Sequence, residues 1–203
     1  MTDSTPTPAR NAPDSASTRD TQTTLSEHAS KALLADYGVS IGRETLVETA
    51  ADAARAAAEL GFPVVVKLCG DAIAHKTERD LVRLNLADRA GVQAAAEELL
   101  SRRCTEDGAV GLLVAEMVRG NRELIAGLVR DPQLGPCVML GIGGIFAEAL
   151  GDVVFAAAPI DQREALRMLR GLALSHLLTE PFRGDPPVDE AVLARTLVGL
   201  GRL

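Results

Sequence analysis

The sequence predicts an α/β protein made of two α+β subdomains. Two observations point to this fold class. In the first half of the chain, helical patterns alternate with short β-patterned runs, whereas the second half places several short strands close together with turns between them. A single doubly wound sheet would keep the alternation of strand and helix to the end, so segregated layers fit the pattern better.

The predicted helices are recognised by apolar residues at helical spacing and by residues suited to capping their ends. Gly38 stands where a helix C-terminal cap belongs, since glycine adopts the left-handed conformation without strain. Thr49, Asp88 and Asp161 each precede a helical pattern and can accept hydrogen bonds from its first free amides. The helices are therefore expected over residues 25–37, 50–60, 89–103, 162–170 and 189–203.

The predicted strands are short and rich in aliphatic residues. The run at 63–68 is apolar without alternation, which indicates that both of its faces are covered. The runs at 111–118 and 123–129 are separated by a polar turn, Arg119-Gly-Asn121, and are expected to form a hairpin. Further extended segments are expected over 39–47, 82–86, 137–140 and 153–157.

The composition excludes some classes of partner. The chain has 203 residues, enough for one large domain or two small ones, and 47% of them are apolar. Its net charge of −7, its 2% aromatic content and its lack of Trp argue against nucleic acid, which is bound through cations and stacking rings. Residues 1–24 hold almost no large apolar side chain, so we expect a disordered tail before one folded region over 25–203.

Three cysteines, Cys69, Cys104 and Cys137, are far apart and show neither metal-ligand spacing nor a disulfide framework. Buried thiols in a reducing compartment are the simplest explanation, so a cytoplasmic location is expected. No stretch approaches 18 uninterrupted apolar residues, and the N-terminus lacks the pattern of a signal peptide. A membrane is therefore not an expected partner either.

Lys67 ends the apolar run 63–68, and a polar loop follows it. An unpaired ammonium is costly to bury, so Lys67 must either extend its charge to water or meet an anion, and extension to water is the commoner case. The loop carries His75 and Lys76, which adds a titratable group and a second cation, as phosphate binding requires. His75 is either a nucleophile or proton shuttle, or an ordinary surface residue or capping donor.

Two carboxylates and a glycine loop are further candidates for a nucleotide site. Glu116 and Glu123 flank the turn of the expected hairpin, where a carboxylate can accept from ribose hydroxyls, although a solvated hairpin tip is the commoner explanation. Gly141-Ile-Gly-Gly144 offers backbone amides to an anion. The dinucleotide fingerprint is incomplete there and no P-loop sequence occurs, so any ATP site must belong to another fold.

Seven short motifs follow one another along the chain: Ala32-Leu-Leu-Ala-Asp-Tyr-Gly-Val39, Gly61-Phe-Pro-Val-Val-Val-Lys67, Ala74-His-Lys-Thr-Glu78, Val82-Arg-Leu-Asn-Leu86, Val114-Ala-Glu-Met-Val-Arg-Gly-Asn-Arg-Glu123, Arg130-Asp-Pro-Gln-Leu-Gly-Pro136 and Gly141-Ile-Gly-Gly-Ile-Phe-Ala-Glu148. In this order they resemble the ATP-grasp domain of ADP-forming acyl-CoA (acetate–CoA) synthetases, from about residue 25 to the end. The same domain also closes the longer chains of some bacterial protein lysine acetyltransferases.

The resemblance implies roles for single residues. Lys67 matches a lysine that contacts ATP phosphates, and Lys76 belongs to the cationic loop that follows it. His75 matches a loop histidine that acts as a second phosphate carrier. Glu116, Met117 and Val118 match the hinge that reads adenine, and Glu123 matches the ribose-facing carboxylate. Gly143 and Gly144, in the glycine loop, are expected to bind the cofactor through their backbone amides.

The resemblance also implies a reaction. A partner histidine takes phosphate from an acyl phosphate and the loop histidine passes it to ADP, so that acyl-CoA, ADP and phosphate give acid, CoA and ATP. A covalent phosphohistidine divides one difficult transfer into easier steps, and Mg²⁺ offsets the developing charge. ATP/ADP and Mg²⁺ are thus the implied cofactors. A separate CoA-binding subunit or domain is the implied partner in a hetero-oligomer, and we expect no turnover without it.

Two departures from the resembled family affect these expectations. Many relatives carry a Gly-Gly pair after the histidine loop, where this chain has Arg79-Asp-Leu81. Relatives also continue past the last helix into two strands that resemble the magnesium site, whereas this chain ends at Gly201-Arg-Leu203. The metal ligands are therefore unassigned, although Glu148 and Asp152 lie near the glycine loop. A non-catalytic remnant, a nucleotide sensor and a part of a protein acetyltransferase system stay open as alternatives.

Overall fold

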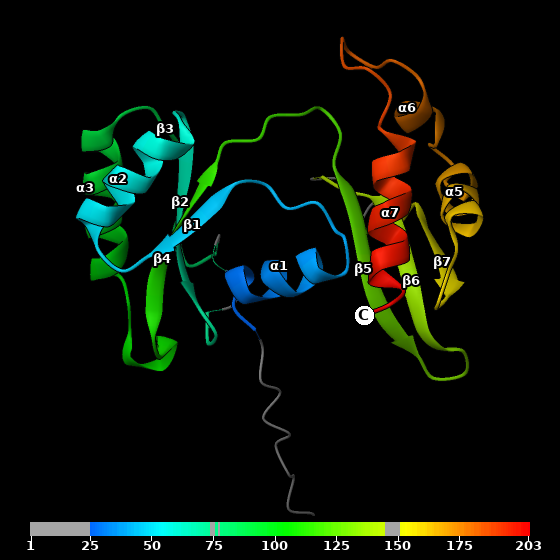
Figure 1. The fold of residues 1–203 in the computed structure, drawn as a ribbon, viewed down its shortest axis with the longest axis horizontal. Helices are drawn as coiled ribbons and strands as arrows, with labels where there is room; N and C mark the ends of the chain where they lie inside the picture. Colours follow the sequence, from blue (N-terminus) through cyan, green and yellow to red (C-terminus); the bar gives the residue numbers. More distant parts are fainter. Residues whose placement is uncertain (1–24, 74–75, 77, 145–150) are drawn as a thin grey trace, which may run out of the picture.

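The computed structural model describes residues 25–73, 76, 78–144 and 151–203. The described chain forms two lobes, each a β-sheet with helices on it, and helix α1 (Glu27–Asp36) lies between them (Figure 1). This arrangement confirms the expected α/β class with two α+β subdomains. The expected disordered tail, His75 and Glu148 lie outside the described residues.

The first lobe contains a four-stranded antiparallel sheet in the order β1-β4-β2-β3. Its strands are β1 (Glu44–Val47), β2 (Val64–Gly70), β3 (Val82–Leu86) and β4 (Val110–Glu116). Its helices are α2 (Ala50–Leu60), α3 (Arg89–Ser101) and the short 3₁₀ helix η1 (Thr105–Asp107). The chain thus places β2 in the interior of the sheet, between β4 and β3.

The packing around β2 explains its continuous apolar run. Val64, Val66 and Leu68 are fully buried in the core that the sheet forms with α2 and α3. The alternate residues face the opposite side of the sheet, where α1 contacts β2 and where Lys67 is mostly buried. Both faces of β2 are therefore covered, as the sequence indicated.

The second lobe contains a three-stranded antiparallel sheet in the order β5-β6-β7. Its strands are β5 (Leu124–Asp131), β6 (Gly135–Ile142) and β7 (Val153–Ala157). Its helices are α5 (Gln162–Gly171), α6 (His176–Thr179) and α7 (Glu190–Leu200). A separate apolar core, centred on side chains such as Leu140, Leu169 and Leu197, joins this sheet to α5 and α7.

The expected hairpin between residues 111–118 and 123–129 is wrong. β4 pairs with β1 and β2, whereas β5 pairs with β6 in the other sheet. The segment 117–123 instead crosses from the first lobe to the second (Figure 1). The true hairpin joins β5 to β6 through a turn in which Asp131 accepts hydrogen bonds from two following amides, at 2.8 Å each. Two neighbouring strand patterns do not by themselves indicate that the strands pair.

The capping residues predicted from the sequence act as caps. The side chains of Thr49, Asp88 and Asp161 each accept a hydrogen bond from the amide three residues further on. Gly38 has a φ of 81°, the left-handed conformation that follows the end of α1. Among the described helices, none is long and apolar enough to cross a membrane.

Helix α1 joins the two lobes. Its Leu34 packs against the core of the second lobe, while other residues of α1 contact β2 in the first. The end of α1 passes so close to α7 that a Cβ atom on Gly199 would collide with the Tyr37 carbonyl oxygen. A glycine at position 199 is therefore required for this approach of the two helices.

Candidate functional site

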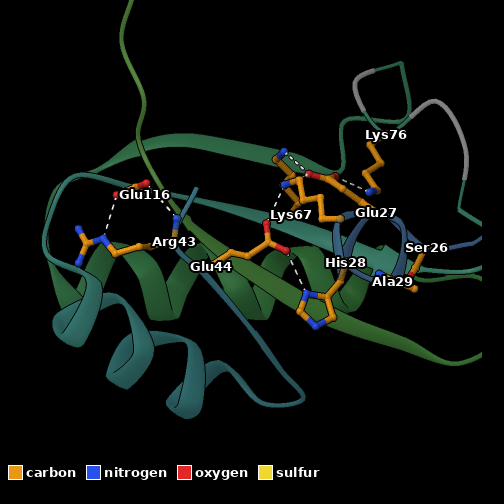
Figure 2. Close-up of polar contacts among 10 residues, drawn as sticks. Ser26, Glu27, His28, Ala29, Arg43, Glu44, Lys67, Lys76 and Glu116 are labelled. Atoms are coloured by element: carbon orange, nitrogen blue, oxygen red, sulfur yellow. Dashed lines mark hydrogen bonds and ion pairs between the residues drawn. The ribbon is translucent and has the colours of Figure 1, made fainter. Parts of the chain in front are cut away.

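Two lysines from separate segments meet at one carboxylate. Lys67 on β2 donates to Glu27 Oε1 at 2.7 Å, and Lys76, between β2 and β3, donates to Glu27 Oε2 at 2.6 Å. Figure 2 shows both side chains directed at Glu27, in the first turn of α1. Lys67 therefore meets an anion supplied by the chain itself, which is the less common of the two possibilities that its sequence pattern allowed.

Glu27 is held in place by a further chain of ion pairs. Lys31, one helical turn on, donates to Glu27 Oε1 at 2.8 Å and to Glu44 Oε2 at 2.7 Å. The other oxygen of Glu44 lies 3.0 Å from Nδ1 of His28 (Figure 2). Because Glu44 opens β1, this chain attaches α1 to the first sheet and fixes the position of Glu27.

The lysines determine the ionisation of Glu27. Burial raises the pKa of the Glu27 carboxyl, but hydrogen bonds from Lys31, Lys67 and Lys76 lower it by more, so the pKa lies well below its usual value of 4.5. Glu27 is therefore a carboxylate throughout the neutral range. Lys31, Lys67 and Lys76 exceed Glu27 and Glu44 by one positive charge, and Asp80, which lines the same cavity, balances it. An anionic ligand would therefore be attracted by the two nearby ammonium groups of Lys67 and Lys76 and not by an overall positive charge.

A surface cavity of about 390 Å³ opens at this cluster. Its lining combines charged groups with exposed aliphatic ones and consists of Glu27, Lys67, Lys76, Asp80, Val82 and Leu84. An anion that enters meets the ammonium groups of Lys67 and Lys76 as well as two carboxylates, Glu27, which both lysines contact, and Asp80, which is paired with Arg83 and Arg102. A second cavity of about 430 Å³ lies between the end of α1, α5 and α7, and none of the site residues predicted from the sequence lines it.

The three residues predicted to read adenine lie where the chain leaves the first sheet. Glu116 accepts from the Arg43 amide at 2.9 Å and from Arg43 Nε at 3.0 Å, and these bonds lower the pKa of its carboxyl (Figure 2). The amide of Met117 donates to the Pro63 carbonyl at 3.3 Å, while the Val118 side chain is exposed. These residues begin the crossing between the lobes, and their contact with adenine stays a prediction.

The structure places Glu123 beside the two predicted glycines. The amide of Gly143 donates to the Glu123 carbonyl at 2.7 Å, and a Cβ atom on Gly143 would lie 3.0 Å from the Glu123 backbone. A Cβ atom on Gly144 would lie 3.8 Å from Glu123 Oε2. The Glu123 carboxylate thus stands next to the glycine pair, but the Gly143 amide already serves a backbone hydrogen bond and is not available to an anion.

The described residues do not form a metal centre. In residues 25–73, 76, 78–144 and 151–203, no group of three or more His, Cys, Asp or Glu side chains could hold a metal ion. Asp152, one of the two carboxylates noted near the glycine loop, accepts from the amides of Ala173 and Leu174 at 2.9 Å each. Asp152, directly before β7, therefore holds the segment that follows α5.

Glu27 is a site residue that the sequence patterns did not reveal. Its two partners, Lys67 and Lys76, which were predicted to bind phosphate, lie 40 and 49 positions further along the chain. An acidic residue in the first turn of a helix is ordinary, because the positive end of the helix dipole favours it. One signal was available: Glu27 and Lys31 are spaced by four residues, which places them on one face of the helix.

Comparison with known proteins identifies the family. A model of the ATP-grasp domain matches residues 16–203. The chain is 34% identical over 182 residues to the acetate–CoA ligase (ADP-forming) I subunit beta of Pyrococcus furiosus, covering 88% of this chain and 78% of that subunit. It is 35% identical over 182 residues to the 4-hydroxybutyrate–CoA ligase (ADP-forming) of Nitrosopumilus maritimus, covering 88% of this chain but only 26% of that longer protein.

Solved structures agree with this comparison. The dinucleotide-forming acetyl-coenzyme A synthetase 1 of Ca. Korarchaeum cryptofilum, in complex with coenzyme A, Ca-AMPCP and HgCl+, matches with a TM-score of 0.80 at 35% identity, over 89% of this chain and 80% of that chain. The same synthetase with coenzyme A and Mg-AMPPCP matches with a TM-score of 0.73 at 35% identity, over 86% of this chain and 76% of that chain. Motif order, fold and coverage together show that this chain belongs to the ATP-grasp family.

Proposed function

We propose that this chain is the ATP/ADP-binding subunit or domain of an ADP-forming acid–CoA ligase. In this proposal it passes a phosphoryl group between a phosphohistidine on a CoA-binding partner and ADP. The observation that carries the proposal is the convergence of two lysines at one cavity: Lys67 from β2, and Lys76 from the connection in which His75 also occurs. The similar β subunits of Pyrococcus furiosus belong to ADP-forming acetate–CoA ligases, which supports the choice of reaction.

The proposed relay has two balanced steps. An imidazole nitrogen of His75 forms a bond to phosphorus as the N–P bond to the partner's histidine breaks. A β-phosphate oxygen of ADP then attacks the same phosphorus, so that a P–O bond forms, the N–P bond to His75 breaks and ATP results. Lys67 and Lys76 offset the negative charge of the phosphate oxygens in both steps.

The nucleoside end of the ligand is assigned to the crossing between the lobes. Glu116, Met117 and Val118 would read the adenine edge, and the Glu123 carboxylate would accept hydrogen bonds from ribose hydroxyls. Gly144, next to that carboxylate, leaves room for the ligand to approach the backbone. These assignments rest on the matching motif positions and on the pairing of Glu123 with the glycines.

Mg²⁺ is proposed to arrive as part of the nucleotide complex. The neighbouring synthetase structure with Mg-AMPPCP supports this choice. Mg²⁺ needs several hard oxygen ligands, and the described part of the chain does not gather such a set. We therefore assign no residue of this chain to the metal, and the two steps above do not depend on such an assignment.

Labelling with [γ-³²P]ATP and Mg²⁺ tests the relay directly. We expect acid-labile, base-stable label on the wild-type chain and none on a His75→Asn variant. His176→Asn is the matched control, because His176 begins the short helix α6 and belongs to none of the predicted motifs. Label that persists in His75→Asn would contradict the role of His75.

The partner requires a separate measurement. With a CoA-binding subunit added, we expect formation of acyl-CoA from acid, CoA and ATP, and comigration of the two chains in gel filtration. Binding of ATP in calorimetry without any label, even when that subunit is present, would contradict the relay and favour a nucleotide sensor. Absence of ATP binding would contradict both functions.

A further inference from the structure

The feature that carries a further inference is the single carboxylate shared by Lys67 and Lys76. One lysine comes from the interior of the sheet and the other from the connection after it, yet their ammonium groups contact opposite oxygens of Glu27. Two like charges this close repel each other unless an anion lies between them. Glu27 therefore permits an arrangement that the two lysines would not adopt alone.

Among the residues that the structure describes, the contacts of both ammonium groups leave some of their N–H donors unused. A lysine ammonium has three N–H donors, and within the described residues Lys67 and Lys76 each donate to one oxygen of Glu27. Both side chains are mostly buried, with exposed fractions of 25% and 14%, so the number of directions in which they can move is small. Both lysines line the 390 Å³ cavity, so a phosphate group in it could accept from the N–H donors that Glu27 does not use.

Glu27 is itself fixed before any ligand arrives. It lies in the first turn of α1, whose N-cap Ser26 accepts from the Ala29 amide at 3.2 Å. Lys31 holds it from the same helix, and Glu44 holds Lys31 from β1. The carboxylate therefore has a defined position relative to the sheet, independent of Lys67 and Lys76.

We propose that Glu27 is a positioning residue of the phosphate site, which holds the strand lysine and the loop lysine at one point with donors free for phosphate oxygens. This inference rests on the proposed function and adds a residue to it. It also predicts whether neutralising Glu27 raises or lowers the affinity for phosphate-containing ligands. If Glu27 positions the lysines, its neutralisation weakens the binding of phosphate-containing ligands, whereas a carboxylate that merely competes with phosphate would give tighter binding when neutralised.

The test compares Glu27→Gln with Glu44→Gln. Both substitutions remove a carboxylate that Lys31 contacts, so both loosen the attachment of α1, but only Glu27→Gln releases Lys67 and Lys76. We expect calorimetry to show that Glu27→Gln raises the Kd for ATP at least about tenfold and leaves the Kd for adenosine unchanged. Glu44→Gln should cause a clearly smaller loss of ATP affinity, because both lysine contacts with Glu27 remain, and Glu27→Asp should recover part of the ATP affinity.

Amide exchange gives a second measurement that needs no nucleotide. The Leu81 amide donates to the Lys76 carbonyl at 2.8 Å, so its hydrogen-exchange rate reports whether the segment around Lys76 is held. We expect faster exchange at Leu81 in Glu27→Gln than in Glu44→Gln or wild type. Equal exchange rates in the three proteins would overturn the inference.

The outcomes separate this inference from the proposed function. Tighter ATP binding by Glu27→Gln, or an equal loss of ATP and adenosine binding, would overturn the positioning role while the ATP-grasp function stands. Wild-type protein that binds no ATP would overturn the proposed function. In that case the exchange rate at Leu81 still decides whether Glu27 holds the lysine segment.

Discussion

Arg79 forms a two-pronged ion pair with Asp107: Nη1 lies 2.6 Å from Oδ1 and Nη2 lies 3.0 Å from Oδ2. Asp107 is 2% exposed and also accepts from the Cys104 amide at 2.9 Å. Arg79 lies in the connection between β2 and β3 that also carries Lys76, whereas Asp107 is the last residue of η1, which precedes β4. Arg79 is thus an anchor for that connection.

Arg79→Met should lower thermal stability, because it leaves a nearly buried carboxylate without its charged partner. We expect a decrease in Tm of about 2–4 °C for a chain of this length. Arg55→Met is the matched control, because its partner Asp52 lies on the solvent-facing surface of α2, where an ion pair contributes little. Differential scanning calorimetry measures both Tm values. Equal decreases in Tm would show that the Arg79–Asp107 pair stabilises the fold no more than the surface pair does.

The stability of the fold should decrease in acid. Hydrogen bonds from Arg79 and from the Cys104 amide hold the pKa of Asp107 well below its usual 3.8, and the pKa of Glu27 is also depressed. A depressed pKa in the folded state stabilises the protein fully above the unfolded-state pKa, and this stabilisation is lost as the pH falls below it. We therefore expect Tm to be nearly constant from pH 7 to about pH 5 and to fall steeply below about pH 4.

Asp107→Asn provides the control for that pH dependence. This variant should have a lower Tm at pH 7 and a shallower decrease in Tm below pH 4, because one of the titrating groups is gone. Arg83 and Arg102 lower the pKa of Glu98 to about 2. Because Glu98 lies on the surface, its contribution to the pH dependence of Tm should disappear in high salt. An Asp107→Asn profile parallel to that of wild type would contradict the assignment to Asp107.

Gly199→Ala should destabilise the contact between α1 and α7. The added Cβ atom would overlap the Tyr37 carbonyl oxygen, which is backbone and cannot rotate away. Overpacking of this kind costs about 1–3 kcal/mol of unfolding free energy in urea titrations. Gly171→Ala is the control at another helical glycine, where the added Cβ atom would meet Val154 Cγ1 at an ordinary 3.5 Å and should be neutral or slightly stabilising.

Glu123→Gln tests the ribose assignment. If the carboxylate accepts hydrogen bonds from ribose hydroxyls, the variant should lose about tenfold in ATP affinity, since charge-assisted hydrogen bonds become neutral ones. The backbone carbonyl of Glu123, which accepts from the Gly143 amide, is unchanged by this substitution. Wild type and variant should bind 2′,3′-dideoxy-ATP, which lacks both ribose hydroxyls, with equal affinity. A loss of the same size with that ligand would contradict the assignment of Glu123 to the ribose.

The local structure could be predicted well from the sequence. Thr49, Asp88 and Asp161 cap helices as expected, and the start of β3 and the end of α2 lie where the patterns placed them. These features depend on side chains within a few residues of one another, so a single sequence contains the information. The motif order was equally informative about the family, because the ATP-grasp model matches residues 16–203.

The pairing of strands could not be predicted in the same way. The patterns at 111–118 and 123–129 fit a hairpin, but β4 inserts between β1 and β2 while β5 turns toward β6. Strand pairing depends on which apolar faces can be buried together, and α2 and α3 bury one face of β4 in the first core. The residues of the turn at 119–121 therefore do not indicate whether the strands on either side of it pair with each other.

The sequence by itself determined the longer helices α1, α2, α3, α5 and α7, the caps at Thr49, Asp88 and Asp161, the buried lysine strand and the family to which the chain belongs, but not the short helices η1 and α6. Only the tertiary structure decided that β4 and β5 belong to different sheets and that Glu27 joins Lys67 to Lys76. The physical reason is the separation along the sequence. Caps and periodicity depend on neighbouring residues, whereas the ion pairs of Glu27 with Lys67 and Lys76 form only after α1 has packed on the sheet.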